Sequence, residues 1–174
     1  DTTLLLGPVA LPPPSGVAVF RFETAADLQS LLDEHFPRCD VLIMAAAVAD
    51  YRPIRADGAK LPRTNKNLAL ELEPTPDLVA RCAAAKRPDQ FIIGFALEEA
   101  ASLEQRARDK LKRKGLDAIV ANPLETMGAI EIQARIITAH ADNLLYHSGL
   151  PEFIRSSKRE FATRLIEWIS AFRS

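Results

Sequence analysis

The sequence predicts an α/β fold with a Rossmann-like, mainly parallel sheet, helices on both faces and a small β-hairpin element. Two observations lead to this prediction. Apolar runs of strand length alternate with segments of helical period, which is the order of elements in parallel α/β sheets. Residues 41–48 are apolar at every position, as expected for a central strand that helices cover on both faces.

Each element follows from its local pattern. The expected strands are residues 2–6, 17–22, 41–48, 68–73, 91–96 and 116–121, and residues 134–138 and 143–146 are expected to form the hairpin. The expected helices run from the N-cap Thr24 to about residue 35, from Pro76–Asp77 to about residue 86, over residues 100–114 before Gly115, and from Ser156 or Ser157 onward. Residues 50–67 are polar and have no period, which predicts a long loop.

Two helices show clear apolar stripes. In the helix over residues 100–114, Leu103, Ala107 and Leu111 are expected to face inward. In the final helix, the stripe is Phe161, Leu165, Ile166, Trp168, Ile169 and Phe172.

The composition is that of one globular domain spanning residues 1–174. Of the 174 residues, 48% are hydrophobic and 26% are charged. The 22 Lys and Arg residues nearly balance the 23 Asp and Glu residues, so no domain-wide basic field favours nucleic acid. No apolar run approaches the ~18 residues of a membrane span, and the start lacks a secretory pattern. We expect a cytoplasmic protein with no membrane or nucleic-acid partner.

Cysteine and glycine spacing excludes several kinds of site. Cys39 and Cys82, with three scattered histidines, predict neither a disulfide framework nor a metal site, so both thiols are expected to be structural and reduced. No two of the seven glycines lie closer than nine positions apart. Neither a dinucleotide fingerprint nor a Walker loop can therefore be present.

Polar and small residues follow the most apolar strand. In open α/β sheets the ligand crevice lies at the carboxyl ends of the strands, which favours a site at Asp50. Ala45 and Ala46 would let a planar ring or a sugar approach the backbone. The alternatives are a strand that simply reaches the surface at Asp50 and a helix packed closely on the alanines.

Lysine and arginine residues form two further candidates. Lys60 lies in the long loop, and a mobile cation that closes over a triphosphate can stabilise a leaving group. Arg106, Lys110 and Lys114 recur every four residues and form one stripe on a helix, which could bind phosphates. Solvated side chains explain both features equally well.

The segment Pro76, Asp77, Leu78 and Val79 opens a helix, whose first N–H groups could bind a base edge or an anion. Phe95 could stack on a base. Simple helix capping by Asp77 and a core position for Phe95 remain the alternatives.

Residues 44–53 read MAAAVADYRP, and this segment closely resembles the hallmark of the phosphopantothenate–cysteine ligase (phosphopantothenoylcysteine synthetase) family. This domain is often the carboxyl-terminal half of a bifunctional bacterial coenzyme A protein. Further matches follow in the family's order: LGPV at 6–9, Lys60 ten residues after Asp50, PDLV at 76–79, GFA at 94–96, ARDKL at 107–111, Lys114 and VAN at 120–122.

The resemblance implies a ligation in two steps. CTP activates the carboxylate of 4′-phosphopantothenate as an acyl-cytidylate with loss of pyrophosphate, and L-cysteine then displaces CMP. It implies that Asp50 contacts the ribose, and that Ala45, Ala46, Pro76, Asp77, Leu78, Val79 and Phe95 line the cytidine pocket. Lys60 would be catalytic, and Lys110 and Lys114 would hold the triphosphate with Mg²⁺. A homodimer is expected, with any FMN confined to a separate decarboxylase domain.

The sequence also departs from the family pattern. The family's first strand, its Ser-Ser-Gly loop and a catalytic asparagine precede residue 2 in the usual order, so we expect a domain that lacks its amino-terminal strand, loop and helix and turns over poorly by itself. Leu61 stands where a second flap lysine is common, and residues 123–127 replace a Gly-Phe segment. The rival hypotheses are a nicotinamide-dependent reductase and a non-catalytic nucleotide-binding or assembly module.

Overall fold

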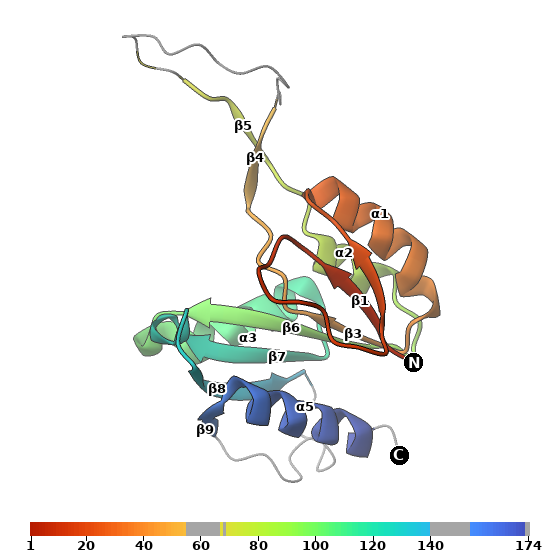
Figure 1. Ribbon diagram of the computed structural model, residues 1–174. Coiled ribbons are helices and arrows are strands. Elements are labelled where there is room, and N and C mark those ends of the chain that lie inside the picture. Colours follow the sequence, from red (N-terminus) through yellow and green to blue (C-terminus); the bar gives the residue numbers. More distant parts are fainter. Residues whose placement is uncertain (55–66, 68, 140–153, 173–174) are drawn as a thin grey trace. The chain divides into compact units, whose positions relative to one another are not determined.

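The computed structural model describes residues 1–54, 67, 69–139 and 154–172 (Figure 1). The chain divides into two compact units. The first unit comprises Asp1–His35 with Ala46–Leu78, and the second comprises Phe36–Ala45 with Val79–Ser174. Each unit is described by itself below.

In the first unit, two parallel strands precede a capped helix. β1 (Thr3–Leu6) pairs with β2 (Ala18–Arg21) from Thr3↔Ala18 to Leu6↔Arg21. The helix α1 (Ala25–His35) follows. The Asp27 N–H donates to Thr24 Oγ1 at 3.1 Å, and the Thr24 N–H donates to Asp27 Oδ2 at 2.9 Å. This reciprocal pair confirms Thr24 as the N-cap. The two side chains accept hydrogen bonds from two backbone N–H groups that have no acceptor within the helix.

The predicted long loop contains a short hairpin. β4 (Tyr51–Pro53) pairs antiparallel with β5 (Leu72–Pro74), and Arg52 Nε donates to Glu73 Oε1 across the pair at 2.8 Å. The expectation of an unstructured segment from residue 50 is therefore wrong for its first residues. The strand expected over residues 68–73 is also displaced, because β5 begins only at Leu72. The alternation of apolar residues gave no sign of the cross-strand pair Arg52–Glu73, which supports this pairing of β4 with β5.

The second unit contains a five-stranded sheet in the order β3-β6-β7-β8-β9. Its strands are β3 (Val41–Met44), β6 (Phe91–Glu98), β7 (Ala118–Pro123), β8 (Glu131–Thr138) and β9 (Ile154–Ser157). The pairs β3/β6 and β6/β7 are parallel, whereas β7/β8 and β8/β9 are antiparallel. The α/β class with a parallel central sheet is confirmed, and the antiparallel strands lie at one end.

Helices accompany the sheet of the second unit. They are α2 (Leu78–Ala85), which begins at the unit boundary, α3 (Leu103–Lys114) and α5 (Lys158–Phe172), with the short helices η1 (Phe36–Arg38), η2 (Ala100–Ser102) and η3 (Leu124–Thr126). In α3, Leu103, Ala107 and Leu111 are buried as predicted, and Gly115 ends the helix with φ 66°. Ser157 Oγ accepts the Glu160 N–H at 3.2 Å, which confirms a serine cap on the last helix.

The core of the second unit joins α5 to one face of the sheet. Its buried side chains are Phe91, Ile93, Ala118, Val120, Ile132, Ala134, Phe161, Leu165, Trp168 and Ile169. Residues of β6 and β7 that alternate with these, such as Ile92 and Ile119, are buried on the opposite face. Arg106 and Lys110 of α3 pair with Glu98, which shares the face of Ile92, so α3 and α5 cover opposite faces.

Two expectations about this unit need correction, and a third concerns residues that the structure does not describe. The strand expected over residues 41–48 ends at Met44 and lies at one end of the sheet order, so within this sheet it is not central. Residues 131–134 of β8 pair with β9, whereas residues 143–146, expected to form a hairpin with residues 134–138, lie outside the described residues, so that expectation stays a prediction. Ile166 is 52% exposed, because at about 100° per residue it lies well away from the face that carries Phe161, Leu165 and Trp168.

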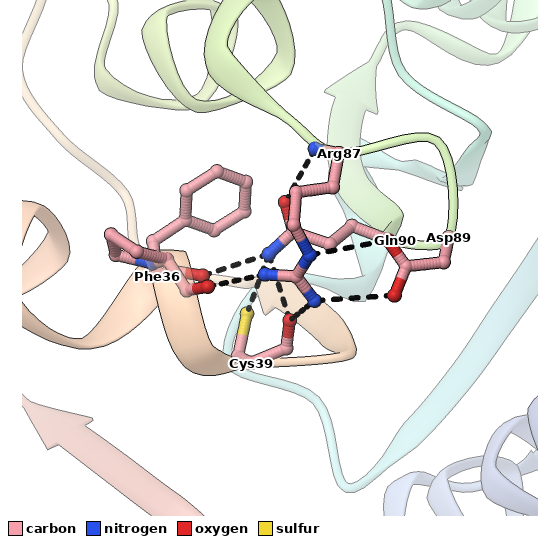
Figure 2. A network of polar contacts seen from close by, with 6 residues as sticks. Phe36, Cys39, Arg87, Asp89 and Gln90 are labelled. Atoms are coloured by element: carbon pink, nitrogen blue, oxygen red, sulfur yellow. Dashed lines mark hydrogen bonds and ion pairs between the residues drawn. The ribbon is translucent and has the colours of Figure 1, made fainter.

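A polar network fixes the chain where β3 begins (Figure 2). The buried Gln90 side chain donates from Nε2 to the carbonyls of Phe36 at 2.8 Å and Cys39 at 2.7 Å, and its Oε1 accepts the Arg87 N–H at 2.8 Å. Arg87 donates to the carbonyl of Pro37 and pairs with Asp89 at 3.1 Å. The turn before β6 thus holds the turn before β3, and the two strands start side by side.

Candidate functional site

The parallel strands β3, β6 and β7 bring several predicted residues to one edge of the second unit's sheet. Met44, the last residue of β3, pairs with Gly94 of β6, and Ala45 and Phe95 follow these two residues directly in the chain. Ala45 is exposed, whereas Phe95 is half-buried and packs against the core. These positions agree with a ligand site at the carboxyl ends of the strands.

Glu98 is the last residue of β6 and lies at the same edge. Its carboxylate pairs with two cations of α3, through Oε1 with Lys110 Nζ and through Oε2 with Arg106 Nη1 at 3.3 Å. The Glu98 side chain is only 9% exposed, compared with 33% for Lys110 and 62% for Arg106. The sequence reasoning missed Glu98, although an acidic residue that ends an otherwise apolar strand was a visible signal.

The environment of Glu98 favours its ionised form. Burial by itself would raise the pKa of this carboxyl group, but the hydrogen bonds and positive charges of Lys110 and Arg106 outweigh burial and lower the pKa below its ordinary value. The edge of the sheet therefore holds a carboxylate whose ionised form is favoured over that of an ordinary glutamate.

Lys110 and Lys114 lie one helical turn apart at the carboxyl-terminal end of α3. Both side chains are half-buried. The structure places Lys110 at the strand edge through its contact with Glu98, and the four-residue spacing keeps Lys114 on the same helix face. The predicted lysine stripe is therefore real, but its first two cations, Arg106 and Lys110, share a carboxylate.

In the first unit, the hairpin brings two predicted segments together. The carbonyl of Asp50 accepts the Thr75 N–H at 2.8 Å, directly beside the pair Tyr51↔Pro74. Asp50, Pro76 and Asp77 are exposed, and so is Ala46. Leu78 and Val79, at the start of α2, are 5% and 8% exposed, so their side chains are packed away from solvent.

The predicted site residues thus fall into two groups, one in each unit. Asp50 and residues 76–78 belong to the first unit, and Ala45, Val79, Phe95 and Lys110 belong to the second. Lys60, predicted to be catalytic, lies outside the described residues.

Metal-binding and thiol chemistry can be assessed within the described part of the chain. In residues 1–54, 67, 69–139 and 154–172, no group of three or more His, Cys, Asp or Glu side chains could hold a metal ion. Cys39 and Cys82 are thiols outside any disulfide, and Cys82 is buried. No helix in these ranges is long and apolar enough to cross a membrane.

Comparison with known proteins gives relatives along nearly the whole chain. The coenzyme A biosynthesis bifunctional protein CoaBC of Mycolicibacterium smegmatis is 33% identical over 184 residues, which cover 99% of this chain and 43% of that protein. A protein from an unknown prokaryotic organism, named cysteine/cysteine sulfinic acid decarboxylase, is 40% identical over 130 residues, 74% of this chain and 36% of its own length. The chain spans less than half the length of these two relatives.

Solved structures share the fold. The crystal structure of the C-terminal domain of coenzyme A biosynthesis bifunctional protein CoaBC superposes with a TM-score of 0.74 at 29% identity and covers 97% of this chain and 74% of that one. A DNA/pantothenate metabolism flavoprotein from Streptococcus pneumoniae has a TM-score of 0.77 at 24% identity over 98% of this chain and 80% of its own.

The family model described as the DNA/pantothenate metabolism flavoprotein C-terminal domain matches residues 1–172. The match includes both the strand edge at Glu98 and the hairpin at Asp50. From its sequence and its fold, this chain belongs to the DNA/pantothenate metabolism flavoprotein C-terminal domain family.

Proposed function

We propose that this domain catalyses the ligation of 4′-phosphopantothenate with L-cysteine at the expense of CTP, a step of coenzyme A biosynthesis. Family membership and the CoaBC relatives support this proposal. The structural observation that favours it most is the placement of Lys110, with Lys114 one turn away, at the carboxyl end of β6. Activating a carboxylate with a nucleotide triphosphate is assisted by cations that bind the phosphate oxygens, where negative charge develops.

The reaction divides into two displacements. In the first, a carboxylate oxygen of 4′-phosphopantothenate attacks the α-phosphorus of CTP, and the bond to the β-phosphate oxygen breaks, which releases pyrophosphate. In the second, the amine of L-cysteine attacks the acyl carbon, loses a proton and expels CMP. Negative charge grows on the departing pyrophosphate in the first step, so the lysines that bind the phosphates lower that barrier.

The proposed roles follow the two groups of residues. Lys110 and Lys114 would bind the triphosphate, and Lys60 would act on it during activation. Asp50 would bind the ribose. The cytidine would lie against the backbone of Ala45 and Ala46, the segment Pro76, Asp77, Leu78 and Val79, and Phe95, with the buried Leu78 and Val79 contributing backbone groups.

Mg²⁺ is proposed to enter with CTP. This ion usually keeps several waters and binds substrate phosphates with one or two carboxylates, so it does not require a cluster of three protein ligands. It would offset phosphate charge during the first step. FMN is proposed only for a separate decarboxylase domain, and the domain itself is proposed to act as a homodimer.

The decisive experiment compares two lysines of α3. In the full-length protein that contains this domain, Lys110→Gln is expected to lower the rate of CTP-dependent pyrophosphate release by about 100-fold or more, the scale for losing a group that stabilises transition-state charge. Lys112→Gln is the matched control, because Lys112 is an exposed lysine of the same helix and has no proposed role. Wild-type release by Lys110→Gln would refute the proposed phosphate site.

A second variant tests the proposed catalytic lysine. Lys60→Gln is expected to abolish pyrophosphate release and to leave the circular dichroism spectrum and thermal midpoint of the protein unchanged. Normal release by this variant would remove Lys60 from the mechanism without affecting the proposal for Lys110.

A further inference from the structure

The contact between Glu98 and α3 has an organisation that the proposed function does not explain. Each carboxylate oxygen of Glu98 has its own cation, Oε1 with Lys110 and Oε2 with Arg106. The cations come from successive turns of one helix, and the carboxylate ends the central strand β6. Strand and helix are thus joined by charge at the edge where the nucleotide is proposed to bind.

Burial makes this arrangement more than a surface ion pair. A carboxylate that is 9% exposed has lost most of its hydration and is stable in the charged form only with close partners. A lysine side chain, by contrast, is a flexible four-carbon stem that loses conformational entropy when it is held in one place. Glu98 therefore holds the Lys110 ammonium in a restricted position before any ligand arrives.

The hydrogen-bonding capacity of Lys110 allows a second partner. An ammonium group has three N–H donors, and one carboxylate oxygen occupies one of them. The remaining donors are available to phosphate oxygens without loss of the contact with Glu98. Arg106 compensates Glu98 through the other oxygen, so the carboxylate stays neutralised when Lys110 shares its charge with a phosphate.

We propose that Glu98 is a positioning residue that orients Lys110 toward the nucleotide phosphates, and that Arg106 supports it from the other side of the carboxylate. This inference rests on the proposed function, because it assigns Lys110 a triphosphate as its ligand. Glu98 does not itself touch the nucleotide: its negative charge would repel phosphate, and it acts only through Lys110.

The test is a double-mutant cycle in the full-length protein, read as kcat/KM for CTP in pyrophosphate release. Glu98→Gln keeps the shape of the side chain and removes its charge, and it is expected to lower kcat/KM by about tenfold, mainly through kcat. In a Lys110→Gln background the same change is expected to have less than about a twofold effect, because a residue that acts through Lys110 has nothing left to position. A merely structural role would lower kcat/KM by the same factor in both backgrounds.

Glu104→Gln is the matched control. Glu104 also lies on α3 and also pairs with two cations, Arg108 at 2.8 Å and Arg135 at 2.5 Å, but it has no proposed role at the site. This variant is expected to keep the wild-type kcat/KM. A loss equal to that of Glu98→Gln would show that any broken ion pair on α3 has this effect, and would overturn the proposal.

Arg106→Gln keeps the proposal testable if Glu98→Gln does not fold. Because Arg106 is 62% exposed, its loss should leave the fold intact. We expect kcat/KM to fall by about threefold, and this loss to disappear in the Lys110→Gln background. Equal losses in both backgrounds, or none in the wild-type background, would contradict the inference. If Lys110→Gln itself had wild-type activity, this result would refute the proposed phosphate site at Lys110, and with it the premise of this inference.

Discussion

The two cations on Glu98 also determine how this carboxyl group responds to acid. Since the pKa of Glu98 is lowered in the folded protein, the contribution of Glu98 to stability is complete above its unfolded-state pKa of about 4.3 and is lost as the pH falls through the lower folded value. Acidification below about pH 5 therefore lowers the free energy of unfolding, because the unfolded chain binds a proton at this carboxyl group more readily than the folded protein does.

The direction of this pH dependence gives a prediction for the stability of the variant Glu98→Gln. At pH 7 the variant is expected to be less stable than the wild type by about 1–3 kcal/mol, the scale for hydrogen bonds to a charged group. The difference should narrow as the pH is lowered from 5 to 3, because the wild-type carboxylate becomes protonated. Urea denaturation at several pH values measures both curves. Glu99→Gln, an exposed neighbour, should follow the wild type, and parallel curves for wild type and Glu98→Gln would contradict the prediction.

At the scale of elements, the Gln90 side chain links the segments that precede β3 and β6 (Figure 2). Its amide satisfies the carbonyls of Phe36 and Cys39 and the N–H of Arg87, all within 2.8 Å. The Phe91 N–H also donates to the Asp40 carbonyl at 2.9 Å, where β3 and β6 begin to pair. Without Gln90, the Arg87 N–H would lose this acceptor, and the carbonyls of Phe36 and Cys39 would keep only the Cys39 N–H at 3.1 Å and the Arg87 guanidinium at 3.4 Å among these contacts.

Gln90→Leu is expected to lower the free energy of unfolding by about 2–4 kcal/mol, because a similar volume is kept while polar groups near a buried site lose their partners. Asp89→Asn is the control, since Asp89 is exposed at the rim of the same network and its loss should cost at most about 1 kcal/mol. Chemical denaturation at pH 7 compares the two. Equal stability of Gln90→Leu and the wild type would show that water replaces the amide.

Local signals in the sequence were sufficient for the helices. Thr24 and Ser157 carry side-chain oxygens that cap a following helix, and Gly115 adopts a positive φ that other residues rarely adopt, so each boundary was determined by neighbouring residues. The pairing of strands was harder to predict. The position of β3 at one end of the sheet order depends on pairing between residues about 50 positions apart in the sequence. The apolar run at residues 41–48 does not predict this pairing.

Only the part of the candidate site that depends on local patterns could be predicted from the sequence. Phe95 lies on β6 as expected, whereas Ala45, which was expected within a strand, follows the end of β3. The ion pair between Lys110 and Glu98 could not be predicted from the sequence. Glu98 lies 12 residues before Lys110, and the two side chains meet only when β6 and α3 pack together. A stripe of cations on a helix does not reveal which of them already has a carboxylate.

Across the whole molecule, buried surface is unevenly distributed between the strands. Every residue of β6 and β7 is buried or half-buried, and both strands pair on each side. All three residues of β4 are exposed, and so are most of β2 and β5. Backbone hydrogen bonds open most readily where few apolar contacts must be broken with them.

Amide hydrogen exchange should therefore follow burial. We expect the amides of β6 and β7 to exchange slowest, with protection that approaches global unfolding, and those of β4 and β5 to exchange at least about 100-fold faster, which corresponds to about 2.7 kcal/mol of opening free energy. Mass spectrometry of peptides covering each strand measures this directly. Adding CTP with Mg²⁺ should slow exchange at the ends of β3 and β6 if the nucleotide binds there. Protection of β4 equal to that of β6 in the free protein would mean that the hairpin is covered by contacts that this structure does not contain.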